Sequence, residues 1–284
     1  MKFKRTNRTR QAGFTMIEAI MVIVITGILS SMVAIFIKSS VDSYLAAERR
    51  AELTEVADLA LRRLSREVRL ALPNSLRVTT VASVTYIEFI PTSDGGRYRD
   101  TGDGSAGGAV LDFVTAANKS FDVLGPMPTL ATGGSGDYIV VYNLGQSPAD
   151  AYSGSNRAQV AAVNLVTGTI TLATNPFPGP PALPSPNSRF QVVPFATRAV
   201  TYACPTAVAG LVTKRWGYGF NAAQQTPPAG GNVATVALTA TCQVDYTQAA
   251  LQRNGILYFR LNVTDVPSGE TVSVFQQIHV DNAP

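Results

Sequence analysis

The sequence predicts an α+β fold, in which a long N-terminal α-helix with a membrane-spanning apolar half precedes a β-rich globular domain of antiparallel sheets. The nineteen residues from Ala19 to Ile37 carry no charge, enough to cross a hydrocarbon layer at about 1.5 Å per residue. Beyond Lys38, apolar residues recur every three or four positions until Pro73. Short stretches rich in β-branched and aromatic residues follow, separated by Gly- and Pro-rich turns.

The positive charge of the chain is concentrated at its N-terminus. The net charge is +4, yet residues 1–13 contain five basic side chains and no acid, so the rest of the chain is close to neutral. A basic tag before an apolar run marks the cytoplasmic end, which places residues after 38 across the membrane. Near neutrality beyond the tag gives no reason to expect a nucleic-acid partner, and the arginines at 62, 63, 66 and 69 suit the negative end of a helix.

We expect one continuous helix over residues 14–72, with 14–37 in the membrane and a stop at Pro73. Asp58 and Arg62 stand four residues apart, as do Arg63 and Glu67, so each pair can form an ion pair on the exposed side. The opposite side carries the apolar stripe Leu53, Val56, Ala60, Leu64, Val68 and Ala71.

Residues 73–284 are expected to form one β-rich domain of two sheets with long surface loops. The predicted strands include TVASVTYIEFI (80–90), AVLDFV (109–114), DYIVVYNL (137–144), RFQVVP (189–194), RAVTYAC (198–204), VATVALT (233–239), ILYFRLNV (256–263) and TVSVFQQIHV (271–280). Turn-rich stretches at 93–108, 133–136 and 176–186 are expected to be loops.

Placing a carboxylate such as that of Glu18 within a membrane-spanning apolar run costs free energy. Glu18 therefore indicates a functional site, unless its side chain simply reaches the lipid headgroups. The basic leader ends in Gly13, and a cut between Gly13 and Phe14 would remove the leader while keeping the helix. The stretch Gly13-Phe-Thr-Met-Ile-Glu18, after a basic leader, resembles the prepilin signature of type IV pilins and type II secretion pseudopilins.

The resemblance implies processing and assembly. A membrane-embedded prepilin peptidase would cut after Gly13 and methylate the new amine of Phe14. Glu18 matches the glutamate that pairs with the N-terminal amine of a neighbouring subunit. The implied partners are other pilin or pseudopilin subunits, an inner-membrane assembly platform and membrane lipid, with the C-terminal domain in the periplasm. The implied work is structural rather than enzymatic.

Within this family the sequence favours a minor subunit. Many major pilins have a helix-bending proline in the upper apolar region, whereas residues 14–72 have none. Residues 44–78 are most similar to minor pilins of the mannose-sensitive haemagglutinin (MSHA) pilus, of the MshO kind. The alternatives are a minor pseudopilin of type II secretion, and a pilus-tip adhesin or DNA-binding module that uses loops such as 93–108 and 176–186.

Cys204 and Cys242 are the two cysteines of the chain. An even pair in an oxidising compartment predicts one disulfide, which would close a loop worth roughly 4 kcal/mol on the chain-entropy model. Two separate buried thiols are the alternative.

The remaining motifs do not indicate a catalytic or ligand-binding site. The spacing of Gly102, Gly104 and Gly107 matches a nucleotide-binding loop, but a strand pattern follows where a helix is required. The aspartates at 94, 100 and 103 lack EF-hand spacing, although a calcium site in loop 93–108 stays open. Pro181 to Pro184 fits a PxxP ligand but is expected to be an exposed loop. His279, the sole histidine, is expected to be structural, and we predict no catalytic residue, metal or cofactor.

Overall fold

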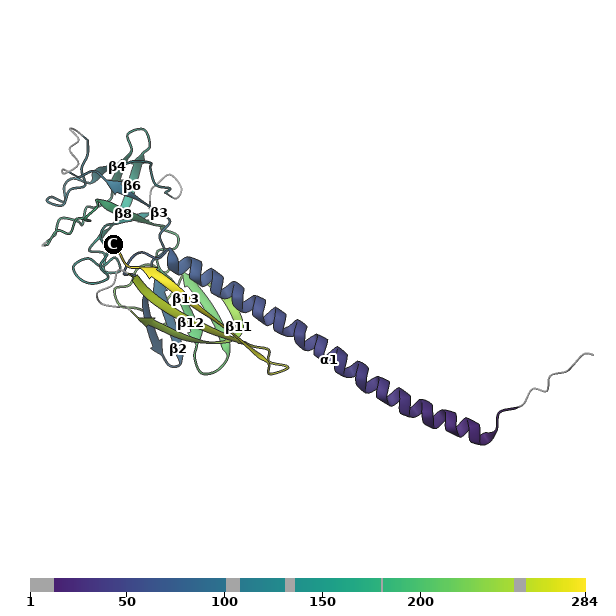
Figure 1. Ribbon diagram of the computed structural model, residues 1–284. Coiled ribbons are helices and arrows are strands. Elements are labelled where there is room, and N and C mark those ends of the chain that lie inside the picture. The colour runs from purple at the N-terminus through teal and green to yellow at the C-terminus, as the bar shows by residue number, and fades with distance from the viewer. Residues whose placement is uncertain (1–12, 101–107, 131–135, 180, 248–253) are drawn as a thin grey trace, which may run out of the picture. The chain divides into compact units, whose positions relative to one another are not determined.

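The computed structural model describes residues 13–100, 108–130, 136–179, 181–247 and 254–284 (Figure 1). Within these ranges the chain forms one α-helix, α1 (Met16–Arg69), and thirteen β-strands. It divides into two compact units, Met1–Ala51 and Glu52–Pro284. The predicted fold class, a long N-terminal helix followed by antiparallel β-structure, is confirmed.

The second unit contains a seven-stranded antiparallel sheet of order β1-β2-β9-β10-β11-β12-β13. Its strands are β1 (Arg77–Val81), β2 (Val84–Phe89), β9 (Val200–Pro205), β10 (Gly210–Trp216), β11 (Asn232–Thr247), β12 (Asn254–Thr264) and β13 (Thr271–Asp281). The long strand β11 pairs with β10 up to Ala240 and with β12 from Ala240 onwards. It therefore joins two parts of one sheet.

The remaining strands form a closed antiparallel barrel inserted between β2 and β9, of order β3-β4-β7-β6-β5-β8. They are β3 (Asp94–Tyr98), β4 (Ser120–Leu124), β5 (Tyr138–Val140), β6 (Arg157–Asn164), β7 (Thr169–Leu172) and β8 (Arg189–Val193). The sequence predicted two sheets. The second one closes on itself around its own core, which includes Phe121, Ile139, Ile170 and Phe190.

The last five turns of α1 belong to the core of the second unit. Ala57, Leu61, Leu64 and Val68 are buried against side chains of the seven-stranded sheet. The predicted apolar stripe is wrong at Val56, which is 40% exposed. Successive residues of an α-helix are rotated by about 100° about its axis, so Ala57, the residue after Val56, takes the buried position instead.

Two of the strand predictions differ from the structure for identifiable reasons. The stretch 80–90 contains a hairpin, because Ala82 and Ser83 both adopt positive φ values, 48° and 61°, and reverse the chain between β1 and β2. The stretch 109–114 is not a strand. The Asp112 carboxylate accepts hydrogen bonds from the amides of Val114 and Thr115, at 2.6 and 2.9 Å, which favours a turn.

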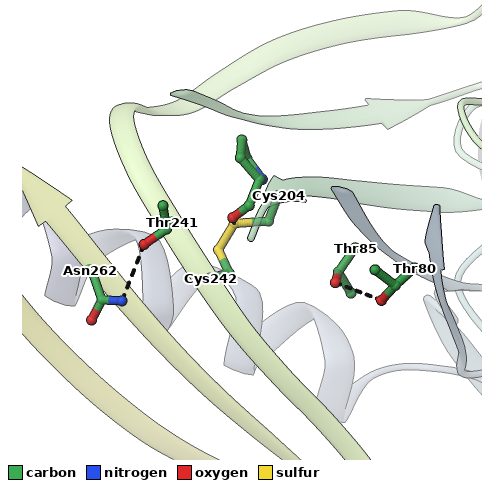
Figure 2. The surroundings of a disulfide bond; sticks show 7 residues. Thr80, Thr85, Cys204, Thr241, Cys242 and Asn262 are labelled. Carbon is green, nitrogen blue, oxygen red and sulfur yellow. Dashed lines mark hydrogen bonds between the residues drawn. A yellow bond between two sulfur atoms is a disulfide. The ribbon is translucent and has the colours of Figure 1, made fainter. Parts of the chain in front are cut away.

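A disulfide joins Cys204 on β9 to Cys242 on β11, with 5.8 Å between the Cα atoms (Figure 2). These strands are separated in the sheet by β10. Strand β10 begins at Gly210, which pairs with Ala240, so Cys242 lies beyond the part of β11 that β10 covers. Both cysteines are buried in the core beneath α1. The disulfide therefore ties together the two parts of the sheet that meet at β11.

Candidate functional site

The N-terminal segment enters α1 through a side-chain cap. Gly13, Phe14 and Thr15 precede the helix, and the Thr15 Oγ1 atom accepts a hydrogen bond from the Glu18 amide at 3.4 Å. A threonine three residues before a glutamate is the capping-box spacing, and it satisfies one of the free amides of the first helical turn. Thr15 is therefore a helix-capping residue that the sequence analysis missed, although its T-x-x-E spacing was visible.

Gly13 has no conformational or steric role in this segment. A Cβ atom added to it would meet no atom within 4 Å, and its φ lies outside the left-handed region. Phe14 is 76% exposed. A bond between a glycine that the fold does not require and an exposed aromatic residue is accessible to another protein.

Glu18 lies in the first turn of α1 and is exposed. A carboxylate there interacts favourably with the positive end of the helix dipole. Within the described residues, no side chain lies within hydrogen-bonding or ion-pairing distance of its carboxylate. The charge of Glu18 is therefore available for a group from outside the described chain.

The apolar part of α1 is suited to a non-aqueous environment. By length and composition the helix could cross a membrane, and its most apolar window is not buried within the chain at all. Two of its hydroxyl groups are satisfied internally, since Thr26 donates to the Val22 carbonyl and Ser31 to the Ile28 carbonyl, both at 2.7 Å. A lipid or helix-packed environment would therefore leave neither hydroxyl without an acceptor.

The comparison with protein families matches this segment. Residues 8–34 fit the family described as the prokaryotic N-terminal methylation motif. The chain has a type IV prepilin-like N-terminus. The match ends at residue 34, so it concerns the leader and the apolar half of α1. No curated protein and no solved structure matched the chain in the other two comparisons.

Beyond the prepilin-like segment, ion pairs and a hydrogen bond around Glu67 fix the C-terminal end of α1 to the sheet. The Glu67 carboxylate accepts from Lys214 Nζ at 2.6 Å and from the Tyr202 hydroxyl at 2.9 Å, and Arg63 lies at 3.3 Å. Burial, reinforced by the negative charge of Glu67, raises the pKa of Tyr202 far above its usual value. The hydroxyl therefore remains protonated and donates to Glu67 at any physiological pH.

A second cluster surrounds Glu88, which is fully buried on β2. Its carboxylate accepts from Arg77 Nε and from the Tyr218 hydroxyl, both at 2.7 Å. The Arg77 guanidinium also lies 3.6 Å from the ring centre of Tyr152, whose hydroxyl donates to the Ser75 carbonyl at 3.0 Å. Burial, followed by the negative charge of Glu88, raises the pKa of both tyrosines. This cluster joins β1 and β2 to the segments carrying Tyr152 and Tyr218.

The other residues considered from sequence do not converge on a chemical site. Asp94 accepts from the amides of Thr129 and Gly95, both at 2.8 Å, which lowers the pKa of its carboxyl. Within the described residues no group of three or more His, Cys, Asp or Glu side chains could hold a metal ion. His279 is exposed on β13. The glycines at 102, 104 and 107 and Asp103 lie outside the described residues.

Proposed function

We propose that the chain is a minor subunit of a type IV pilus of the MSHA kind, assembled through the N-terminal half of α1. The observation that carries this proposal is the exposed apolar N-terminal half of α1, which begins with a capped turn and a carboxylate without a side-chain partner in the described chain. The methylation motif over residues 8–34 supports the broader part of this proposal, a type IV pilin-like or pseudopilin subunit.

The proposed processing follows from the accessibility of the N-terminal segment. Prepilin peptidase cuts between Gly13 and Phe14, and the new amine of Phe14 is methylated. The basic leader is lost, while the apolar segment 14–37 stays as the membrane anchor, with its N-terminus cytoplasmic and residues 73–284 periplasmic. The cut supplies a positive charge at Phe14, four residues before Glu18.

In the assembled filament, Glu18 pairs with the N-terminal amine of a neighbouring subunit. A carboxylate near the headgroups keeps its water, whereas inside a helical bundle it loses that water and needs an opposite charge. The amine of a second subunit meets this need and sets the axial stagger between neighbours. A minor rather than a major subunit is supported by the 54-residue length of α1 without a proline.

Substitution of Glu18 tests the proposal. We expect Glu18→Gln to be processed and inserted normally but to enter filaments at least about tenfold less often, because the pairing charge is absent. Glu48→Gln is the matched control, since Glu48 is also an exposed acid on α1. Filaments are sheared from cells that carry only the variant, and the chain is quantified in the filament and membrane fractions. Normal filament entry of Glu18→Gln would contradict the role of the carboxylate.

The same N-terminus would serve a minor pseudopilin of a type II secretion system. The two functions differ in the assembly that requires the chain. Deletion of the gene should abolish surface pili without changing protein secretion if the pilus proposal is correct. Loss of secretion with normal pili would support the pseudopilus.

A binding role at the pilus tip is a second candidate, because loops beside the barrel line a mainly apolar pocket of about 260 Å³. Phe113 and Val141 line it together with Phe177 and Leu183 from the loop 176–186. Replacement of Leu183 by Asp should abolish attachment while leaving filament number unchanged if the cavity holds a ligand. Unchanged attachment would remove this candidate.

A further inference from the structure

Strand β13 has a partner along one side only. All eleven of its residues, Thr271–Asp281, are in register with β12. Among the strands of the described residues, none pairs with its other side. At about 3.3 Å per residue, this leaves an edge of roughly 36 Å whose outward amide and carbonyl groups can form a further ladder.

The other parts of the β-structure protect their edges. The barrel is closed, so it has no edge strand. The opposite edge of the seven-stranded sheet, β1, is only five residues long, and two of its side chains contact the segment 221–224. Arg77 donates to the carbonyls of Asn221 and Ala222, at 2.7 and 2.8 Å, and Thr79 donates to the Gln224 side chain at 2.8 Å.

Strand β13 lacks the features that normally prevent edge-to-edge pairing. From Thr271 to Val280 it contains no Lys, Arg, Asp, Glu, Pro or Gly, and its pairing with β12 has no bulge. Soluble proteins protect long edges with charges, prolines, bulges or short strands. A long edge without any of these features is suited to receive a strand.

We propose that β13 receives an extended strand from a different subunit of the same assembly, which adds an eighth strand to the sheet. Backbone hydrogen bonds supply the affinity in this mode, and alternating side chains supply the specificity. Val272 and Val274 are only half-buried on the α1 side of β13, so the incoming strand places apolar residues beside them. On the other side Phe275, 61% exposed, stacks on Tyr258 and extends the contact surface.

The donor is a different chain and not another copy of this one. Two copies that pair through β13 about a two-fold axis would have antiparallel helix segments 52–69. Copies that enter one membrane or one filament by the same end of α1 run parallel. β1 has five residues against the eleven of β13, so β1 of another copy would cover less than half of this edge. The absence of Lys, Arg, Asp and Glu from Thr271 to Val280 matches an uncharged donor strand with alternating apolar and polar residues.

Hydrogen exchange of the full chain tests this inference, which rests on assembly as proposed above. Amides of β13 that do not bond to β12 should exchange rapidly in the detergent-solubilised single subunit. They should exchange at least about tenfold more slowly in the filament and membrane fractions. Amides of β12 are the control, because β12 is paired on both sides and should be protected in both states.

The outcomes separate this inference from the proposed function. Equal exchange of β13 in all states overturns the inference, and the proposed function stands if the chain is nevertheless in filaments. Protection of β13 in membranes, in a chain absent from filaments, supports strand addition and contradicts the pilus proposal.

A single thiol identifies the donor. Cys204 and Cys242 are bonded to each other, so Gln277→Cys introduces a free thiol on β13 to which a benzophenone maleimide can be attached. We expect photo-crosslinks to a strand-forming peptide of another pilin-like subunit, identified by mass spectrometry. Val81→Cys on β1 is the matched control and should give none. A dimer of this chain as the main product would overturn the choice of donor.

Discussion

At the scale of single residues, three glutamates show how environment decides what a carboxylate does. Glu67 is held by Lys214 and Tyr202, and buried Glu88 is held by Arg77. Glu18 is exposed at the start of α1, and the described chain offers it no partner. The first two stabilise the folded unit, whereas the third is the one that we propose to pair with a neighbouring subunit.

Arg77→Met should therefore destabilise the chain by about 3–5 kcal/mol, because it leaves Glu88 buried without an opposite charge. Arg62→Met is the control. Arg62 pairs with Asp58 at 2.6 Å, but both side chains are largely exposed, so the loss should stay below about 1 kcal/mol. Trp216, the single tryptophan, packs on the core and reports unfolding by fluorescence during denaturant titration. Equal effects of the two substitutions would contradict this account of Glu88.

At the scale of elements, α1 has two halves with different surroundings. Its N-terminal half exposes apolar side chains on every face, while its C-terminal half buries one face against the sheet. Both ion pairs predicted from i,i+4 spacing are present, Arg62 with Asp58 and Arg63 with Glu67. The amphipathic half therefore belongs to the second unit, whereas the most apolar part of the helix has no buried face within the described chain.

Truncation of a leucine side chain should lower the free energy of unfolding by different amounts on the two faces of the C-terminal half of α1. Leu64 is 2% exposed and Leu59 is 69% exposed. Leu64→Ala should lower the free energy of unfolding by about 2–5 kcal/mol, since it leaves a cavity against the sheet. Leu59→Ala should change it by less than about 0.5 kcal/mol. The same denaturant titration measures both. A small loss for Leu64→Ala would mean that α1 does not pack on the sheet as described.

The sequence was most informative where periodicity and composition act locally. It predicted α1 and the long strands β11, β12 and β13. It missed β3, β4, β6, β7 and β10. Strand β3 consists of Asp-Gly-Gly-Arg-Tyr, in which partners on both sides override low propensity. The β1–β2 turn uses Ala82-Ser83 rather than Asn-Gly, so no turn signal marked it. The Thr15 cap could have been predicted. The unprotected edge of β13 required the sheet order.

At the scale of the whole chain, the barrel is an insertion that the sheet supports. It leaves the sheet after β2 and returns at β9. Between the two, a third core cluster contains Leu72 and Ile90 from the sheet side and Val140 and Val193 from barrel strands. The Glu88 cluster adds the contact between Arg77 and Tyr152. The barrel is therefore anchored by apolar packing and by one buried ionic cluster.

The disulfide contributes to the stability of the whole sheet. Cys204 and Cys242 are 38 residues apart in sequence, which corresponds to roughly 4 kcal/mol on the chain-entropy model. We expect complete reduction under denaturing conditions, followed by refolding with the thiols kept reduced, to lower the unfolding free energy by about that amount. Trp216 fluorescence gives the comparison with the oxidised chain. Equal stability of the two forms would contradict the stabilising role of the bond.

The central claim is that the apolar half of α1 belongs to a processed subunit that assembles through its own N-terminus. N-terminal mass analysis of the protein extracted from membranes of its native host tests this claim most directly. The account predicts a mature chain that begins at Phe14, with a methylated amine and the leader removed. A chain that begins at Met1, or one cut beyond Ile37 so that the helix loses its anchor, would contradict it.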